Sequence, residues 1–176
     1  MISGTPYYSK NFTNSIIVLP NGDSGTLAIR YDMFQDEMEF KKEDKTLWLN
    51  KKEVNTISYG GEKMIVTRLQ NDSSKLGYFF MPAEGKYSLL IKRSVEYRPY
   101  VPPKPYGEAV PERFANVGDD YYLKAEGMPP QSFKNKKALL GMLEGNKAAL
   151  DFIKKEKTKT DDTEDLKKLI NFLNSQ

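Results

Sequence analysis

The feature that most limits the possible folds is a series of short strand-like segments in the first half of the sequence, separated by turns. In the stretch TLAIRY, the apolar residues Leu27, Ile29 and Tyr31 occur two apart, which places them on one face of a strand. Asn21 and Gly22 precede this stretch and can supply the positive φ angles of a tight hairpin. Further segments follow at intervals of about 8–12 residues, which is typical of an antiparallel meander, sandwich or barrel.

The pattern becomes helical near the C-terminus. The last apolar stripe, spaced as on one face of a helix, consists of Leu166, Leu169, Ile170 and Leu173. Asp161, with Glu164 three residues later, resembles a capping box that starts this helix. We therefore predict an α+β fold. It has an antiparallel sheet, a sandwich or half-barrel, in residues 1–96, a proline-rich strap in residues 97–118, and a returning strand with C-terminal helices in residues 119–176, forming one structural unit with the sheet.

The expected strap contains the stretch YRPYVPPKPYGEAVPERF, which holds five of the ten prolines in the chain. Its two PxxP spacings are those of polyproline segments that dock into aromatic grooves, so a ligand for a partner protein is one interpretation. However, Tyr97, Tyr100 and Tyr106 alternate with the prolines. We favour a semi-rigid strap in which these three side chains are buried against the sheet or the helices.

Composition argues against many enzymes. The chain has no Cys and no His, which removes thiolate nucleophiles, imidazole bases and the usual zinc ligands. Phosphate-cradling glycine motifs are absent, and DDTED (residues 161–165) lacks the spacing of a calcium loop, so we expect no cofactor and no metal. Asp36, Glu37 and Glu39 keep open a carboxylate hydrolase. Because Glu37 and Glu39 lie opposite Met38 and Phe40 on a strand, we expect these two carboxylates in solvent, without a catalytic role.

Charge and hydropathy limit the partners. A net charge of +3, spread along the chain, does not indicate a nucleic-acid partner. No apolar run approaches the roughly 20 residues of a membrane-spanning helix, so the protein is not expected to span a membrane. The N-terminal residues lack the basic and apolar regions of a signal peptide. Either the protein is cytoplasmic, or the sequence begins where a signal peptide has been removed.

Four stretches together resemble a family of uncharacterised exported proteins of Bacteroidetes bacteria. They are ISGTPYYSKNFTNSIIV, LAIRYDMFQDEMEFK, YSLLIKRSVEYRPYVPPKPYGEAVPERF and KKALLGMLEGNKAALDFIKKEKTKTDDTEDLKKLINFLN. The resemblance covers nearly the whole chain and implies a periplasmic or otherwise exported location, with the chain starting about where mature members begin. It carries no activity and no site residues.

These observations favour a non-catalytic envelope protein that binds an envelope protein or a glycan. The candidate interaction surface consists of Tyr7, Tyr8, Tyr97, Tyr100 and Tyr106. Neighbouring aromatic residues on a strand point to opposite sides, so either both faces of the sheet are covered or one face presents aromatic rings. Two alternatives remain: a carrier that holds a small apolar ligand in an enclosed cavity of the curled sheet, and a hydrolase that works through Asp or Glu.

Overall fold

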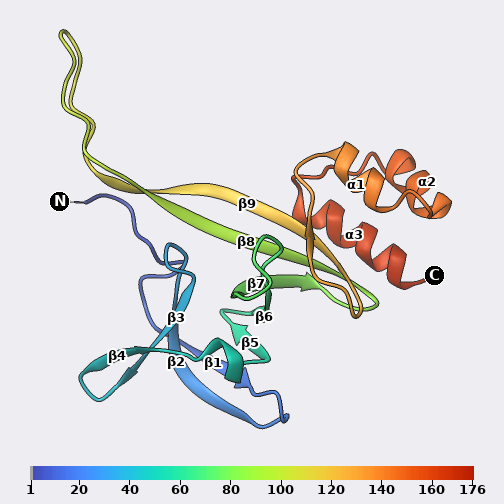
Figure 1. Ribbon diagram of the computed structural model, residues 1–176, viewed down its shortest axis with the longest axis horizontal. Helices are drawn as coiled ribbons and strands as arrows, with labels where there is room; N and C mark the ends of the chain where they lie inside the picture. The colour runs from blue at the N-terminus through green and yellow to red at the C-terminus, as the bar shows by residue number, and fades with distance from the viewer. Residues whose placement is uncertain (1) are drawn as a thin grey trace. The chain divides into compact units, whose positions relative to one another are not determined.

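The computed structural model describes residues 2–176 and divides the chain into two compact units. The first unit comprises Met1–Gly60 and Arg93–Gly118, and the second comprises Gly61–Lys92 and Asp119–Gln176. Within the described residues, ten strands pair in antiparallel fashion and three α-helices follow near the C-terminus; Figure 1 shows how the chain runs through them. The predicted α+β class and the antiparallel sheet are therefore confirmed. Strands β8 (Tyr87–Arg98) and β9 (Arg113–Ala125) each contribute residues to both units.

The first unit holds a meander with the strand order β5-β1-β2-β3-β4. Its elements are β1 (Thr13–Val18), β2 (Ser24–Asp32), β3 (Glu37–Lys42), β4 (Lys45–Trp48), the short 3-10 helix η1 (Lys51–Glu53) and β5 (Thr56–Tyr59). Val18 pairs with Ser24 across the first hairpin, and Gly22 in its turn has a φ of 90°. The predicted turn is present, and Gly22 supplies a positive φ angle as expected, whereas Asn21 is not among the residues with a positive φ.

The second unit holds β6 (Glu62–Arg68), β7 (Leu76–Ala83), β10 (Gln131–Ser132) and the adjoining parts of β8 and β9, in the order β6-β7-β8-β9-β10. Tyr78, Phe79 and Phe80 are consecutive in β7, and each is only 1% exposed. Since successive side chains of a strand point to opposite faces, both faces of β7 are covered. Of the two arrangements that consecutive aromatic residues allow, β7 therefore has the one in which both faces of the strand are covered.

Three helices complete the second unit: α1 (Lys136–Met142), α2 (Lys147–Lys155) and α3 (Thr163–Asn174). The predicted apolar stripe of α3 is buried, and α3 packs on β7. The cap is one residue later than predicted, since Asp162, not Asp161, accepts a hydrogen bond from Asp165 N at 3.0 Å. Within residues 2–176, no helix is long and apolar enough to cross a membrane.

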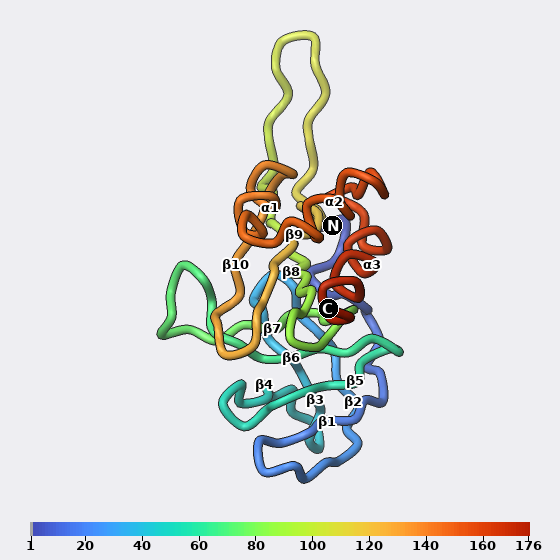
Figure 2. Tube along the Cα trace, turned by 90° about the vertical axis from the view of Figure 1, so that its right-hand side faces the viewer, coloured from blue at the N-terminus to red at the C-terminus, as the bar shows by residue number. Residues whose placement is uncertain are grey.

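The proline-rich segment is not a buried strap. Strand β8 continues to Arg98, β9 begins at Arg113, and Val101 pairs with Val110 between them, so residues 97–114 form a hairpin arm (Figure 2). The exposed fractions of Tyr97, Tyr100 and Tyr106 are 39%, 56% and 110%. The predicted burial of these three side chains is wrong, because the arm pairs with itself instead of lying on other elements.

The prediction for Glu39 also fails. Its side chain faces away from Met38, as expected, but Glu39 is only 6% exposed. The N-terminal segment pairs with the end of β2, since Tyr8 N donates to Tyr31 O at 3.0 Å and Met33 N donates to Pro6 O at 2.8 Å. Its Tyr7 ring lies 3.6 Å from the guanidinium of Arg30, the ion-pair partner of Glu39. A polar residue in an alternating strand therefore meets the protein's own N-terminal segment instead of solvent.

Candidate functional site

The apex of the hairpin arm is a tight turn. Gly107 N donates to Lys104 O at 2.9 Å, so Pro105 and Tyr106 occupy the two central positions. Tyr106 has a φ of 67°, which is the left-handed region that the third residue of a type II turn requires. Glycine or asparagine normally fills that position, since a bulky side chain there is strained. The arm therefore holds a fully exposed tyrosine in an unfavourable backbone conformation.

The base of the arm is anchored by aromatic rings and by the N-terminal segment. The Phe114 ring lies 5.6 Å from the Tyr97 ring and 5.5 Å from the Phe34 ring, centroid to centroid. Phe114 N donates to Ser3 O at 2.9 Å. The Tyr97 hydroxyl donates to Glu112 Oε2 at 2.6 Å, and this hydrogen bond to a carboxylate raises the pKa of Tyr97. These contacts fix the base and leave the apex free of them.

Apolar side chains remain exposed along the arm. They are Tyr97, Tyr100, Val101, Tyr106 and Val110. Single exposed apolar side chains are normal on a protein surface, but a hairpin whose large side chains are mostly exposed gains little stability from them. The three predicted tyrosines of the arm are thus brought onto one element, although for a different reason from the one that the sequence suggested.

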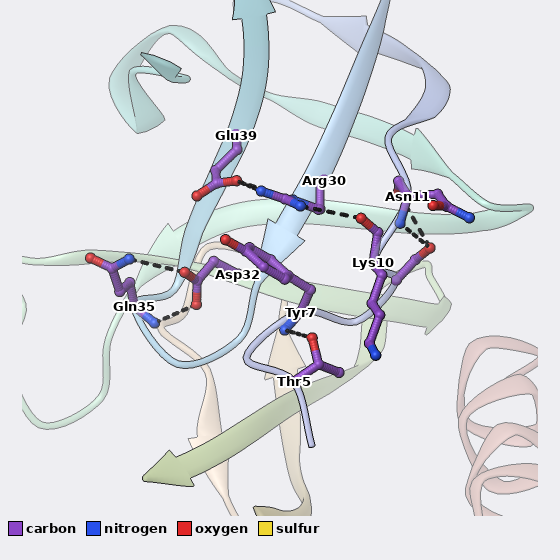
Figure 3. A network of polar contacts seen from close by, with 9 residues as sticks. Thr5, Tyr7, Lys10, Asn11, Arg30, Asp32, Gln35 and Glu39 are labelled. Carbon is purple, nitrogen blue, oxygen red and sulfur yellow. Dashed lines mark hydrogen bonds and ion pairs between the residues drawn. The ribbon is translucent and has the colours of Figure 1, made fainter. Parts of the chain in front are cut away.

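Tyr7 has a structural role in a polar cluster of the first unit (Figure 3). The Arg30 guanidinium lies 3.6 Å from the centre of the Tyr7 ring and donates to Glu39 Oε2 at 2.6 Å and 3.1 Å. It also donates to Lys10 O at 3.2 Å. Burial, and then the nearby Glu39 charge, raise the pKa of Tyr7. Half-buried Tyr7 therefore helps to hold the N-terminal segment on β2 and β3.

Tyr8, the other predicted residue of this segment, is 40% exposed. Its ring lies 5.8 Å from the Tyr59 ring, and its hydroxyl accepts a hydrogen bond from Arg93 Nη1 at 3.0 Å. Tyr8 therefore connects the N-terminal segment to β8 within the first unit. Of the five predicted surface residues, Tyr7 and Tyr8 make these internal contacts, whereas Tyr100 and Tyr106 belong to the free part of the arm.

The carboxylates of the hydrolase alternative make internal contacts. Glu39 pairs with Arg30, and Glu37 Oε1 accepts from Lys51 Nζ at 2.7 Å. Asp36 Oδ1 accepts from the Tyr31 hydroxyl at 2.7 Å. A carboxylate that neutralises a neighbouring cation and fixes a strand has a sufficient structural role. These contacts explain all three residues without a reaction.

The acidic run DDTED serves the start of α3. Asp162 caps the helix, and Asp165 Oδ2 accepts a hydrogen bond from Lys159 N at 3.1 Å. Acidic side chains at this end of a helix are also favoured by the helix dipole. In the part of the chain that the structure describes, no three Asp, Glu, His or Cys side chains gather as a metal site would need.

Sequence reasoning missed one hollow in the second unit. It has a volume of about 680 Å³, is open to solvent, and lies between the end of β6 and the segment from Lys124 to Gln131. One wall includes most of the stretch EGMPPQS, residues 126–132. Its exposed Met128 and paired prolines were the available signal, but the opposite wall comes from residues about 60 positions earlier.

Comparisons with known proteins return no relative. No family model, no curated protein and no solved structure matches the chain.

Proposed function

We propose that this protein is a non-catalytic, exported protein of the cell envelope that binds another protein through its hairpin arm. The observation that supports this proposal most directly is Tyr106, which is 110% exposed at the apex with a φ of 67°. Neither the exposure nor the backbone angle contributes to the stability of the isolated chain. Strained, exposed residues of this kind are concentrated at sites that contact other molecules.

The chemistry of the arm fits a protein partner. Tyrosine offers a large, rigid and amphipathic contact area with few rotatable bonds, which makes it common in protein-binding loops. Tyr100 and Tyr106 supply such area, and Pro102, Pro103 and Pro105 limit the freedom that the loop loses on binding. A glycan is the other ligand that exposed tyrosine rings can hold, and the experiment below distinguishes the two.

The location and the finer architecture are also proposals. The resemblance to exported Bacteroidetes proteins supports a periplasmic or otherwise exported location. A sandwich or half-barrel curvature of the sheet stays a prediction.

Site-specific photo-crosslinking tests the proposed function. A benzophenone amino acid replaces Tyr106 in the cell that makes the protein, and adducts are separated by size after irradiation. We expect one discrete protein adduct, which is reduced by excess unlabelled protein but not by excess of the double variant Tyr100→Ser, Tyr106→Ser. The matched control carries the same probe at Lys155, an exposed residue at the end of α2, and should give no such adduct.

Three results would contradict the proposal. Equal crosslinking from both positions means that the adduct reflects abundance and not the arm. No adduct from either position means that the arm has no protein partner in the cell. Adducts that disappear on glycosidase treatment, without a change in protein content, indicate a glycan ligand instead.

A further inference from the structure

The hollow of the second unit has walls that are joined to each other. One wall is the end of β6 with the following loop, and the other is the end of β9 with β10. Ser132 N in β10 donates to Gln70 Oε1 in the loop at 2.9 Å, which connects the two walls. The volume of about 680 Å³ lies within the range of about 300–1,000 Å³ that is usual for small-molecule sites.

Much of the lining is apolar. It includes Val66, Leu69, Leu76, Met128, Pro129 and Pro130. Met128 is 55% exposed, in a loop between a turn and two prolines. Methionine is flexible and polarizable, so it can adapt its shape to an apolar ligand. The hollow therefore offers a surface to a hydrocarbon chain or a ring.

The charged residues of the lining all carry the same sign. Arg68 and Lys124 both contribute to it, whereas no Asp or Glu does. The ion pairs among residues 2–176 involve neither of these two cations. The acidic residue of the neighbouring loop, Asp72, already pairs with Lys75 at 3.3 Å. Two cations beside an apolar surface thus lack a negative partner.

We propose that this hollow binds a small amphipathic anion, with an apolar chain or ring and one carboxylate. The apolar lining takes the body of the ligand, and Arg68 and Lys124 take the carboxylate by charge-assisted hydrogen bonds. A neutral apolar molecule would leave both cations without a partner. This inference does not depend on the hairpin arm, because all lining residues belong to the second unit.

Decanoate, used below its micelle-forming concentration, is a suitable probe. Titration of the isotope-labelled full chain, followed by backbone amide NMR, reports both affinity and location. We expect saturable binding at concentrations below about 1 mM. The largest shifts should fall on residues 66–70 and 124–131. Decanol and decylamine have the same chain length without the negative charge, and should bind at least about tenfold more weakly.

Two charge variants and a matched control test the role of the cations. Arg68→Gln and Lys124→Gln should each weaken decanoate binding about fivefold to tenfold and leave decanol binding unchanged. Lys155→Gln makes the same change of charge on an exposed residue outside the hollow and should have no effect. Arg68 and Lys155 are exposed and Lys124 is half-buried, and the amide spectrum of each variant verifies its fold.

The proposal is overturned by any of four results. The first is no saturable shift up to about 1 mM decanoate. The second is that decanol binds as tightly as decanoate, which would mean that the hollow does not select a negative charge. The third is a set of shifts outside the hollow, including on the arm. Binding to anionic lipid vesicles without binding to decanoate also contradicts it, because a membrane surface would then be the ligand.

Discussion

The side-chain amide of Asn174 pairs with the backbone of Tyr87 as a neighbouring strand would. Tyr87 N donates to Asn174 Oδ1 at 2.8 Å, and Asn174 Nδ2 donates to Tyr87 O at 2.9 Å. A third bond joins Asn174 Nδ2 to Glu84 O at 3.3 Å. The last residue of α3 thus fastens the helix to the turn between β7 and β8.

Asn174→Ala should therefore destabilise the second unit. The change leaves the amide and carbonyl groups of Tyr87 without their partner, which costs about 1–3 kcal/mol. Chemical denaturation followed by helical circular dichroism measures the loss. Asn171→Ala, at an exposed position on the same helix, is the control and should change stability by less than about 0.5 kcal/mol. Equal effects of the two variants would mean that helix propensity, not the pairing with Tyr87, sets the result.

The Arg30–Glu39 ion pair should matter more than the exposed pair on α3. Glu39→Ala leaves the guanidinium of Arg30 without its charged partner in a largely buried position, for which we expect a loss of about 2–3 kcal/mol. Glu164→Ala breaks the exposed Glu164–Lys167 pair and should cost less than about 0.5 kcal/mol. Denaturation curves give both values.

Release of the N-terminal segment is a second readout for Glu39→Ala. Hydrogen exchange should become faster at the amide of Tyr8, which bonds to Tyr31 O in the native protein. If hydrogen exchange at the Tyr8 amide is unchanged while the expected loss of stability is observed, the polar cluster does not hold the N-terminal segment.

Gly4 should not tolerate a side chain. It has a φ of 77°, and a methyl group added there would lie 2.2 Å from the carbonyl oxygen of Phe114. Gly4→Ala should therefore detach the N-terminal segment from the base of the arm, which accelerates hydrogen exchange at the Phe114 amide. Gly118→Ala is the control, since its φ of 94° causes strain but nothing lies within 4 Å. If hydrogen exchange at the Phe114 amide is equally fast in the two variants, backbone strain alone explains the effect.

Tyr106→Gly should separate stability from binding. The left-handed conformation costs a non-glycine residue about 1–2 kcal/mol, and glycine removes this cost at an entropic penalty of about 0.5–1 kcal/mol. We expect a gain of up to about 1 kcal/mol in thermal unfolding together with weaker crosslinking of a partner by a probe at Tyr100. Tyr106→Ala loses the same ring but keeps the strain, so it should weaken binding without that gain.

Alkaline pH should destabilise the second unit through Tyr122. Burial, and then the Asp120 charge, raise the pKa of Tyr122 above its ordinary value of 10.0. The folded state then holds the Tyr122 proton more tightly than the unfolded state does. The protonated hydroxyl therefore stabilises the folded state fully below pH 10, and this stabilisation is lost as the pH rises above that value. Between about pH 8 and 11, the free energy of unfolding should fall less steeply with pH for Tyr122→Phe than for the unchanged protein. Tyr100→Phe, at an exposed side chain, should leave the slope as it was.

Local sequence patterns predicted the elements well where neighbouring residues decide the outcome. Alternation of apolar residues identified β2 and β3, and the turn signal at Asn21 and Gly22 identified the hairpin between β1 and β2. The spacing of Leu166, Leu169 and Ile170 identified α3. These signals depend on backbone angles and on side-chain periodicity within one segment. The break between α1 and α2 was predictable for the same reason, since Asn146 caps the second helix locally.

Burial by distant segments was decided only by the tertiary structure. Glu39 has the sequence position of a solvent-facing residue, yet it is buried, and Tyr7 of the N-terminal segment lies against its partner Arg30. No local pattern records that contact. Tyr100 and Tyr106 look like packing residues, yet the arm pairs with itself and leaves them exposed. The hollow brings Arg68 and Lys124 to one lining from positions 56 residues apart. Periodicity determines which way a side chain points, but only the complete fold determines what lies there.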